Sequence, residues 1–316
     1  MKSIKPALKQ RGSALLTALF IMTLVAICAT AMSLRLQLDI YRTRLSIGSD
    51  KLYLASQATT FWAIGILYDQ KTGLNRIKVG GALIDFPPSL ENIYPDVITK
   101  GRLYDLQAVF NLNNLLDKKF QLVFLNLLEH ALPKIGASDR EKLMRDIIYA
   151  MSPYQPEHGE INQLSFYLKQ VPPYLPGFQS LHSPSELRII PHVSPILYQT
   201  LLPFITTLPE VTPININTAS NALLMSLGNG LNERELNELL QARGTKGFKN
   251  INALNGLLEK LNIPMDQITL ESTYYLAVST TSSEDLNLTH YSVLKRIKNK
   301  QGDRFIQIIS DSLNTE

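Results

Sequence analysis

Residues that could do chemistry are few in this sequence, and they are scattered. The chain has one cysteine, Cys28, and five histidines without paired spacing, namely His130, His158, His182, His192 and His290. A disulfide framework or a thiolate metal site needs several cysteines. The sequence also contains no Gly-x-Ser-x-Gly nucleophile motif and no Gly-rich phosphate loop. These residues therefore favour a binding or structural role, and we expect no enzyme activity.

The net charge of the chain lies in its first twelve residues. Four basic residues and no acidic residue precede Ser13, and the formal net charge of the whole chain is +4. Residues 13–316 therefore hold 27 basic and 27 acidic side chains. A nucleic-acid-binding domain carries its basic excess on the folded surface, so this distribution argues against that class. The length of 316 residues and the 45% hydrophobic content allow one large domain or two smaller ones.

Residues 13–34 form an uncharged apolar segment. As a helix, this segment would span about 33 Å, enough to cross the roughly 30 Å hydrocarbon core of a bilayer. Because basic residues precede it, the positive-inside rule keeps residues 1–12 in the cytoplasm and places the chain after Arg35 outside it.

Three interpretations of this N-terminal region remain open. A secretory signal peptide would be cut after a small-x-small site such as Ala29-Thr30-Ala31, although the apolar stretch is long for that class. An uncleaved signal anchor fits the length equally well. The third interpretation is a type IV prepilin leader, in which a peptidase cuts between Gly12 and Ser13 and the apolar helix remains on the mature chain.

Apolar or small residues continue after the membrane segment at alternating steps of three and four, which is typical of one helix face. No proline occurs between Ser13 and Tyr68, so we expect one helix of roughly 55 residues and about 80 Å. A membrane span followed by a separate helix, with Gly48 as the break, is the alternative. We expect the stripe to pack against sister helices through Leu38, Tyr41, Leu45, Leu52, Trp62 and Ile66.

The rest of the chain predicts an α+β protein. We expect a loop at 71–100, a strand at 102–112, helices between 115 and 268, and three antiparallel strands at 273–281, 286–297 and 303–310. A lone strand at 102–112 would lack a partner, so we favour an all-α domain inserted into a small sheet over two consecutive domains. The expected division is a leader at 1–12, a membrane part at 13–34, a stalk, loop and first strand at 35–112, an inserted domain at 113–270 and final strands at 271–316.

Three segments carry a resemblance to a known family. They are FNLNNLL (110–116), PPYLPGFQSLHSPSELRII (172–190) and FITTLPEVTPININTASNALLMSL (204–227). In this order, together with the basic leader and the long helix, they resemble the minor pseudopilin K family of type II secretion. Within the third segment the family motif falls on Ile214, Asn215, Asn217, Thr218 and Ala219.

The resemblance implies a pilin-like fold with a long N-terminal transmembrane and amphipathic helix, a small antiparallel sheet and a large inserted helical domain. It implies a non-catalytic subunit of the Gram-negative inner membrane with most of the chain in the periplasm. Its partners would be other minor pseudopilins and the major pseudopilin, at the tip of a pseudopilus that acts on exoprotein cargo below the secretin. Prepilin peptidase would cut at Gly12-Ser13, and the new amine would be methylated.

Two positions depart from the pattern that the resemblance implies. Ordinary pilins carry Glu at the fifth mature position, and Thr17 stands there; a tip subunit has no neighbour above it whose amine would pair with that carboxylate. Alternatively, Thr17 is a membrane residue that bonds to its own helix. The family also often has an acidic calcium loop, but residues 149–167 offer only Glu157 and Glu160. We therefore expect no metal and no other cofactor.

A rival resemblance points to a different class of protein. Residues 214–254 are similar to helix-hairpin-helix DNA-binding modules, with Gly228-Asn229-Gly230 as the turn and Arg243 after it, as in exported DNA-uptake proteins. In such modules the turn's N–H groups and nearby basic residues hold phosphates. Here the following helix carries Glu233, Glu235 and Glu238, which oppose phosphate binding. We therefore favour a protein contact over nucleic acid.

Overall fold

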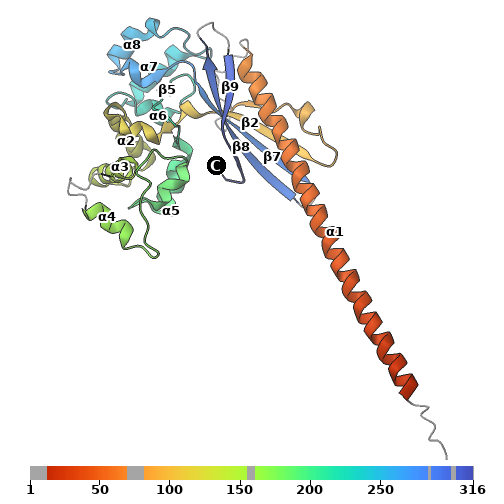
Figure 1. Ribbon diagram of the computed structural model, residues 1–316. Helices are drawn as coiled ribbons and strands as arrows, with labels where there is room; N and C mark the ends of the chain where they lie inside the picture. The colour runs from red at the N-terminus through yellow and green to blue at the C-terminus, as the bar shows by residue number, and fades with distance from the viewer. Residues whose placement is uncertain (1–12, 70–81, 155–160, 284–285, 300–303, 316) are drawn as a thin grey trace, which may run out of the picture.

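A computed structural model describes residues 13–69, 82–154, 161–283, 286–299 and 304–315. One helix, α1 (Ser13–Tyr68), has 56 residues, projects far from the rest of the protein and packs with its second half on a sheet (Figure 1). The predicted continuous helix is confirmed, and the alternative of two helices separated at Gly48 is excluded. Gly48 lies inside α1, where an added Cβ would come within 2.8 Å of Cδ1 of Leu286. The glycine thus allows the sheet to approach the helix.

The sheet has five strands in the order β1 (Ala82–Asp85), β2 (Ile98–Asp105), β7 (Tyr274–Ser283), β8 (Leu286–Lys298) and β9 (Arg304–Leu313), each antiparallel to its neighbours. Because β2 pairs with β7, the segment between them is an insertion into the sheet, as predicted. The expected strand at 102–112 instead ends at Asp105. The expected loop at 71–100 contains β1, which adds a fifth strand.

Small hydroxyl side chains join α1 to the sheet. Thr59 Oγ1 lies 3.0 Å from Ser279 Oγ, and Thr60 Oγ1 lies 3.0 Å from Ser292 Oγ, with all four residues buried. Apolar contacts flank these pairs, because Ala63 and Leu67 of α1 pack with Leu103, Tyr275 and Leu294 of the sheet. The second half of α1 is therefore part of the core of this domain.

The inserted segment contains seven α-helices within its described residues, and all of them except α4 contribute side chains to one large apolar core. The helices lie together to one side of the sheet (Figure 1). They are α2 (Lys118–Ala131), α3 (Ala137–Met151), α4 (Ile161–Leu168), α5 (Pro195–Leu201), α6 (Asn221–Met225), α7 (Glu233–Arg243) and α8 (Asn255–Lys260). Side-chain caps from Ser194, Ser220 and Asn232 begin three of them, as the Ser and Asn positions in the sequence predict. Within the range 115–268, where helices are expected, Pro184–Ile189 forms a 3-10 helix.

Two features of the insertion were not predicted. Helix α4 overlaps residues 149–167, where the resemblance implies a loop in related proteins. The insertion is also not all-α, because it contains two parallel pairs of two-residue strands. These pairs are β3 (Phe110–Asn111) with β4 (Ile205–Thr206), and β5 (Ile214–Asn215) with β6 (Ile268–Thr269).

Further 3-10 turns occur in both parts of the protein. They are η1 (Pro88–Leu90) between β1 and β2 and, in the inserted segment, η2 (Leu106–Ala108), η3 (Leu112–Leu116), η6 (Leu202–Phe204), η7 (Asn252–Leu254) and η8 (Met265–Gln267).

Candidate functional site: the stalk helix and the domain junction

The first half of α1 is an apolar helix that nothing in the chain covers. Residues 13–44 are all exposed, and Leu38 and Tyr41 retain 56% and 60% of their accessible surface. By length and composition this helix can cross a membrane. An exposed apolar surface of this extent marks a contact with lipid or with other proteins. Leu45, at the end of this region, is half-buried.

The second half of the predicted stripe has a different role. Leu52 is 1% exposed and packs with Ala55, Val97 and Leu288, and Trp62 and Ile66 pack against the cluster around Leu103. The expectation that Leu52 contacts a sister helix is therefore wrong, because the chain's own sheet buries it. Trp62 and Ile66 are only partly buried, so their contact with sister helices stays a prediction, as it does for Leu38, Tyr41 and Leu45.

At the membrane end of α1, the hydroxyl of Thr17 donates to the carbonyl oxygens of Ser13 and Ala14, at 3.1 and 3.0 Å. The helix itself thus satisfies the polar group that replaces a carboxylate, which removes most of the cost of placing it in lipid. Gly12, on the other side of the predicted cleavage point, lies outside the described residues.

The family motif lies where the inserted domain joins the sheet. Asp105, the last residue of β2, is buried and accepts hydrogen bonds at Oδ2 from Thr218 Oγ1 (2.5 Å), Ser272 Oγ (2.7 Å) and Asn215 Nδ2 (3.0 Å). The N–H of Gln107 donates to its Oδ1 at 2.8 Å. Burial raises the pKa of Asp105, while these four donors oppose that shift. The entry and exit of the inserted domain are thus tied to one carboxyl group.

The other motif residues also hold backbone segments together. The amide of Asn217 donates to the carbonyls of Phe248 and Leu270, both at 3.0 Å, and its oxygen accepts from Phe248 N at 2.7 Å. Ile214 lies in β5, and Ala219 is 2% exposed. The motif therefore stabilises the junction, and none of its residues is available to bind a ligand.

Three asparagines in the segment 110–116 form a similar clamp that the sequence reasoning missed. Asn111, Asn113 and Asn114 are at most 3% exposed. Their side-chain amides form hydrogen bonds with backbone N–H and C=O groups of residue 181 and of the segment 208–212. The available signal was three amides within an otherwise apolar segment, because a buried amide must find partners.

The backbone N–H groups of the turn in the helix-hairpin-helix-like segment form hydrogen bonds within the protein. Gly228 N donates to Gln267 Oε1 at 3.3 Å, and Gly230 N donates to the carbonyl of Leu227 at 3.0 Å. Arg243 donates to the carbonyl of Ile216 at 3.1 Å, and burial lowers its pKa. The groups that would hold phosphates in a DNA-binding module are thus engaged in internal contacts.

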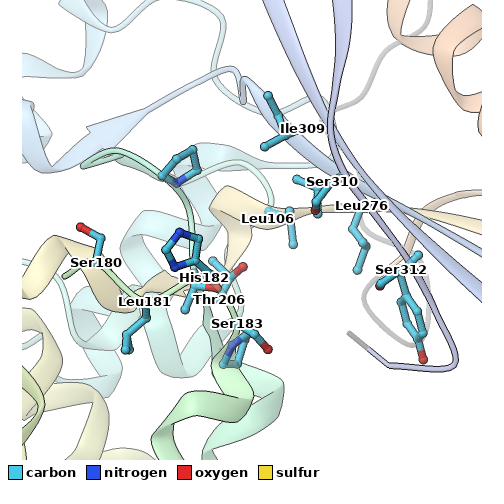
Figure 2. A pocket seen from close by; sticks show the side chains of 15 residues that line it. Leu106, Ser180, Leu181, His182, Ser183, Thr206, Leu276, Ile309, Ser310 and Ser312 are labelled. Carbon is cyan, nitrogen blue, oxygen red and sulfur yellow. The ribbon is translucent and has the colours of Figure 1, made fainter. Parts of the chain in front are cut away.

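A cavity of about 300 Å³ lies between the sheet and the inserted domain, and Figure 2 shows the residues that line it. Leu106, Leu276 and Ile309 come from the sheet side, and His182 and Thr206 lie across from them on the inserted domain. The lining contains no Asp, Glu, Lys or Arg.

In the part of the chain that the structure describes, no group of three or more His, Cys, Asp or Glu side chains could hold a metal ion. Glu157, His158 and Glu160 lie outside that part.

A half-exposed apolar helix on a small antiparallel sheet, with a helical domain inserted in the sheet, defines a pilin-like membrane-anchored subunit. Two family models for "Type II secretion system (T2SS), protein K" match residues 108–210 and 214–272, which together make up half of the chain. The chain therefore belongs to the type II secretion system protein K family of minor pseudopilins. Helix α1, the one apolar helix of membrane-spanning length among the described residues, fits anchoring in the inner membrane with the bulk of the chain in the periplasm.

Relatives and a solved structure agree with this assignment. Type II secretion system protein K of Pseudomonas aeruginosa is 26% identical over 310 residues, covering 92% of this chain and 90% of that protein. The Aeromonas hydrophila protein is 29% identical over 271 residues, covering 78% and 80%. A chain from the crystal structure of the GspK-GspI-GspJ complex of enterotoxigenic Escherichia coli has a TM-score of 0.68 at 21% identity, with 87% of this chain and all of that chain covered. At that identity the likeness establishes the fold.

Proposed function

We propose that this protein assembles with other minor pseudopilins and with the major pseudopilin at the tip of the periplasmic pseudopilus. There it initiates the fibre and promotes protein export across the outer membrane through the secretin. It is a substrate of prepilin peptidase at Gly12-Ser13, and the new amine of Ser13 is methylated. Its role is non-catalytic and includes no metal cofactor.

The observation that carries this proposal is the division of α1 into two halves. The second half is fixed in the protein's own core, while the first half is exposed along its full length. An 80 Å rod of this kind, about 1.5 Å per residue over 56 residues, can lie in a membrane and later pack beside similar rods. The solved complex of GspK with GspI and GspJ supports assembly with two further pseudopilins.

Intact-mass spectrometry of the mature full-length chain tests the processing step. We expect a chain that begins at methylated Ser13, because only this cut retains the exposed helix. A chain that begins at Met32 would be a secretory product without an anchor and would contradict the proposal. Co-purification from detergent of the full chain with the other pseudopilins of its own secretion system tests the assembly step. Failure of every pairwise and combined purification would contradict it.

A further inference from the structure

The two edges of the sheet differ in length and character. One edge is β1, which has only four residues and lies beside an ion pair between Asp85 and Arg102 (3.5 Å). These features are ones that proteins use to prevent strand pairing at an edge. The other edge is β9, which has ten residues and pairs only with β8 among the described strands. The N–H and C=O groups on its outer side form a template for another strand.

The outer strand is also apolar and largely exposed. Between residues 305 and 310 it carries no charged side chain, and Phe305, Ile308 and Ile309 retain 56%, 41% and 36% of their surface. A monomer would not benefit from an edge of this type, because it invites aggregation. An interface that covers this edge in the assembled state accounts for it.

We propose that an extended, apolar and uncharged strand of another polypeptide adds to the sheet beside β9. In the assembly proposed above, on which this inference rests, that polypeptide is another pseudopilin. Main-chain hydrogen bonds to β9 supply the affinity, and side-chain contacts supply the specificity. The register shift in the β8–β9 ladder between Val293 and Leu294 leaves Ile309 without an in-register partner and divides the edge into two regular parts, 304–308 and 310–313, of which 304–308 is the more apolar.

The cavity shown in Figure 2 lies next to this edge and supports the same occupant. Ile309, Ser310 and Ser312 of β9 line it together with Leu276 and Tyr291. Its volume of about 300 Å³ is at the lower end of the range for ligand pockets. With its apolar, uncharged lining, the cavity accepts one apolar side chain at the end of the added strand.

The direction of α1 argues against a second copy of this chain as the occupant. Two β9 strands that paired antiparallel would be related by a twofold axis perpendicular to the sheet. Because α1 lies along the sheet and projects beyond it, this axis would point the two membrane helices in opposite directions (Figure 1). Both helices could not then enter the same membrane from the same side. Antiparallel pairing with a second copy is therefore excluded, and in the assembly proposed above the strand comes from a different pseudopilin chain.

Hydrogen–deuterium exchange on the full-length chain tests the proposal, alone and in its purified complex with the other pseudopilins in detergent. We expect those amides of residues 304–308 that point away from β8 to exchange at least about tenfold more slowly in the complex, because the others already bond to β8. In the double variant Phe305→Lys/Gln307→Lys, two exposed lysines on the edge should remove this protection and weaken the complex by about tenfold or more. The matched control is Leu175→Lys in the inserted domain, because Leu175 is 58% exposed and Phe305 is 56% exposed.

The outcomes separate this inference from the proposed function. A complex that forms without protection of β9 would overturn the strand addition and leave the assembly intact. A complex that never forms would overturn both. Protection of β9 in the chain alone, rising with its concentration together with a doubled mass, would identify a second copy and also contradict the inference. If Leu175→Lys weakens the complex as much as the Phe305→Lys/Gln307→Lys double variant does, the effect is not specific to β9 and the inference is contradicted.

Discussion

Gly101 of β2 lies against α1, and its replacement by alanine tests how the helix is held on the sheet. A Cβ at this position would lie 2.4 Å from Cγ2 and 2.7 Å from Oγ1 of Thr59, and 3.0 Å from Cβ of Phe86. Thr59 is fully buried and bonded to Ser279, so it cannot move away without losing that hydrogen bond. The strand and the helix must therefore separate.

The magnitude follows from two contributions. Overpacking of a core costs about 1–3 kcal/mol, and loss of the Thr59–Ser279 hydrogen bond adds about 0.5–1.5 kcal/mol. We therefore expect Gly101→Ala to lower the free energy of unfolding by about 2–4 kcal/mol. At roughly 2–4 °C per kcal/mol, Tm should fall by about 4–16 °C.

Trp62 provides the assay, because it is the only tryptophan and its ring lies edge-on to that of Phe86 with 5.5 Å between the centroids. Its fluorescence during thermal unfolding of the full chain in detergent reports separation of the helix from the sheet. The matched control is Gly65→Ala in α1, where an added Cβ meets no atom within 4 Å. This control should be neutral or stabilising by up to about 1 kcal/mol.

A double-mutant cycle decides the cause. Thr59→Ala removes the two nearest of the three close atoms and leaves only Cβ of Phe86. Gly101→Ala/Thr59→Ala should therefore be more stable than the sum of the two single changes predicts, by about 1 kcal/mol or more. If Gly101→Ala unfolds like the unmodified chain, or if the two changes are additive, the close approach of Gly101 to Thr59 does not hold the helix.

Two further predictions concern the junction and the stripe. Burial raises the folded-state pKa of Asp105 above its unfolded value, so its contribution to stability is fully present below about pH 4 and is lost as the pH rises through the folded pKa. Denaturant unfolding should therefore show the unmodified chain losing stability relative to Asp105→Asn as the pH rises, and a difference that is constant with pH would contradict this. On the helix, Leu52→Ala should lower the free energy of unfolding by about 2–5 kcal/mol. Leu38→Ala should change it by less than about 0.5 kcal/mol but reduce recovery of the pseudopilin complex, and the reverse pattern would refute the division of α1.

The long helix and the insertion could be predicted because both depend on patterns that the sequence carries directly. Alternating steps of three and four without proline specify a helix, and a strand without a local partner implies one far away in the chain. Strand β1 was missed because four residues within a segment rich in Gly and Pro carry too little alternation. The surface that packs against the apolar stripe could not be predicted either, since Leu52 would show the same spacing whether it faced its own sheet or a sister helix.

The role of the family motif could not be predicted for a related reason. Thr218 and Asn215 bond to Asp105, which precedes them by 113 and 110 residues. No local pattern reports a hydrogen bond across that distance. An amide or hydroxyl that serves a buried carboxylate has the same sequence signature as one that binds a ligand, and only the burial of the group distinguishes them.

The contacts of these buried groups form a continuous mechanical path from the membrane to the inserted domain. Thr59 and Thr60 fix α1 to β7 and β8, and β2 leads directly into Asp105 at the junction. Gln107 continues the path, because its Oε1 accepts from Thr273 N and its Nε2 donates to the carbonyl of Pro213 at 2.8 Å. Leaving one buried donor unsatisfied costs about 1–3 kcal/mol, so the inserted domain cannot swing on the sheet without breaking several such contacts. Displacement of the helix along its axis therefore moves the inserted domain with it.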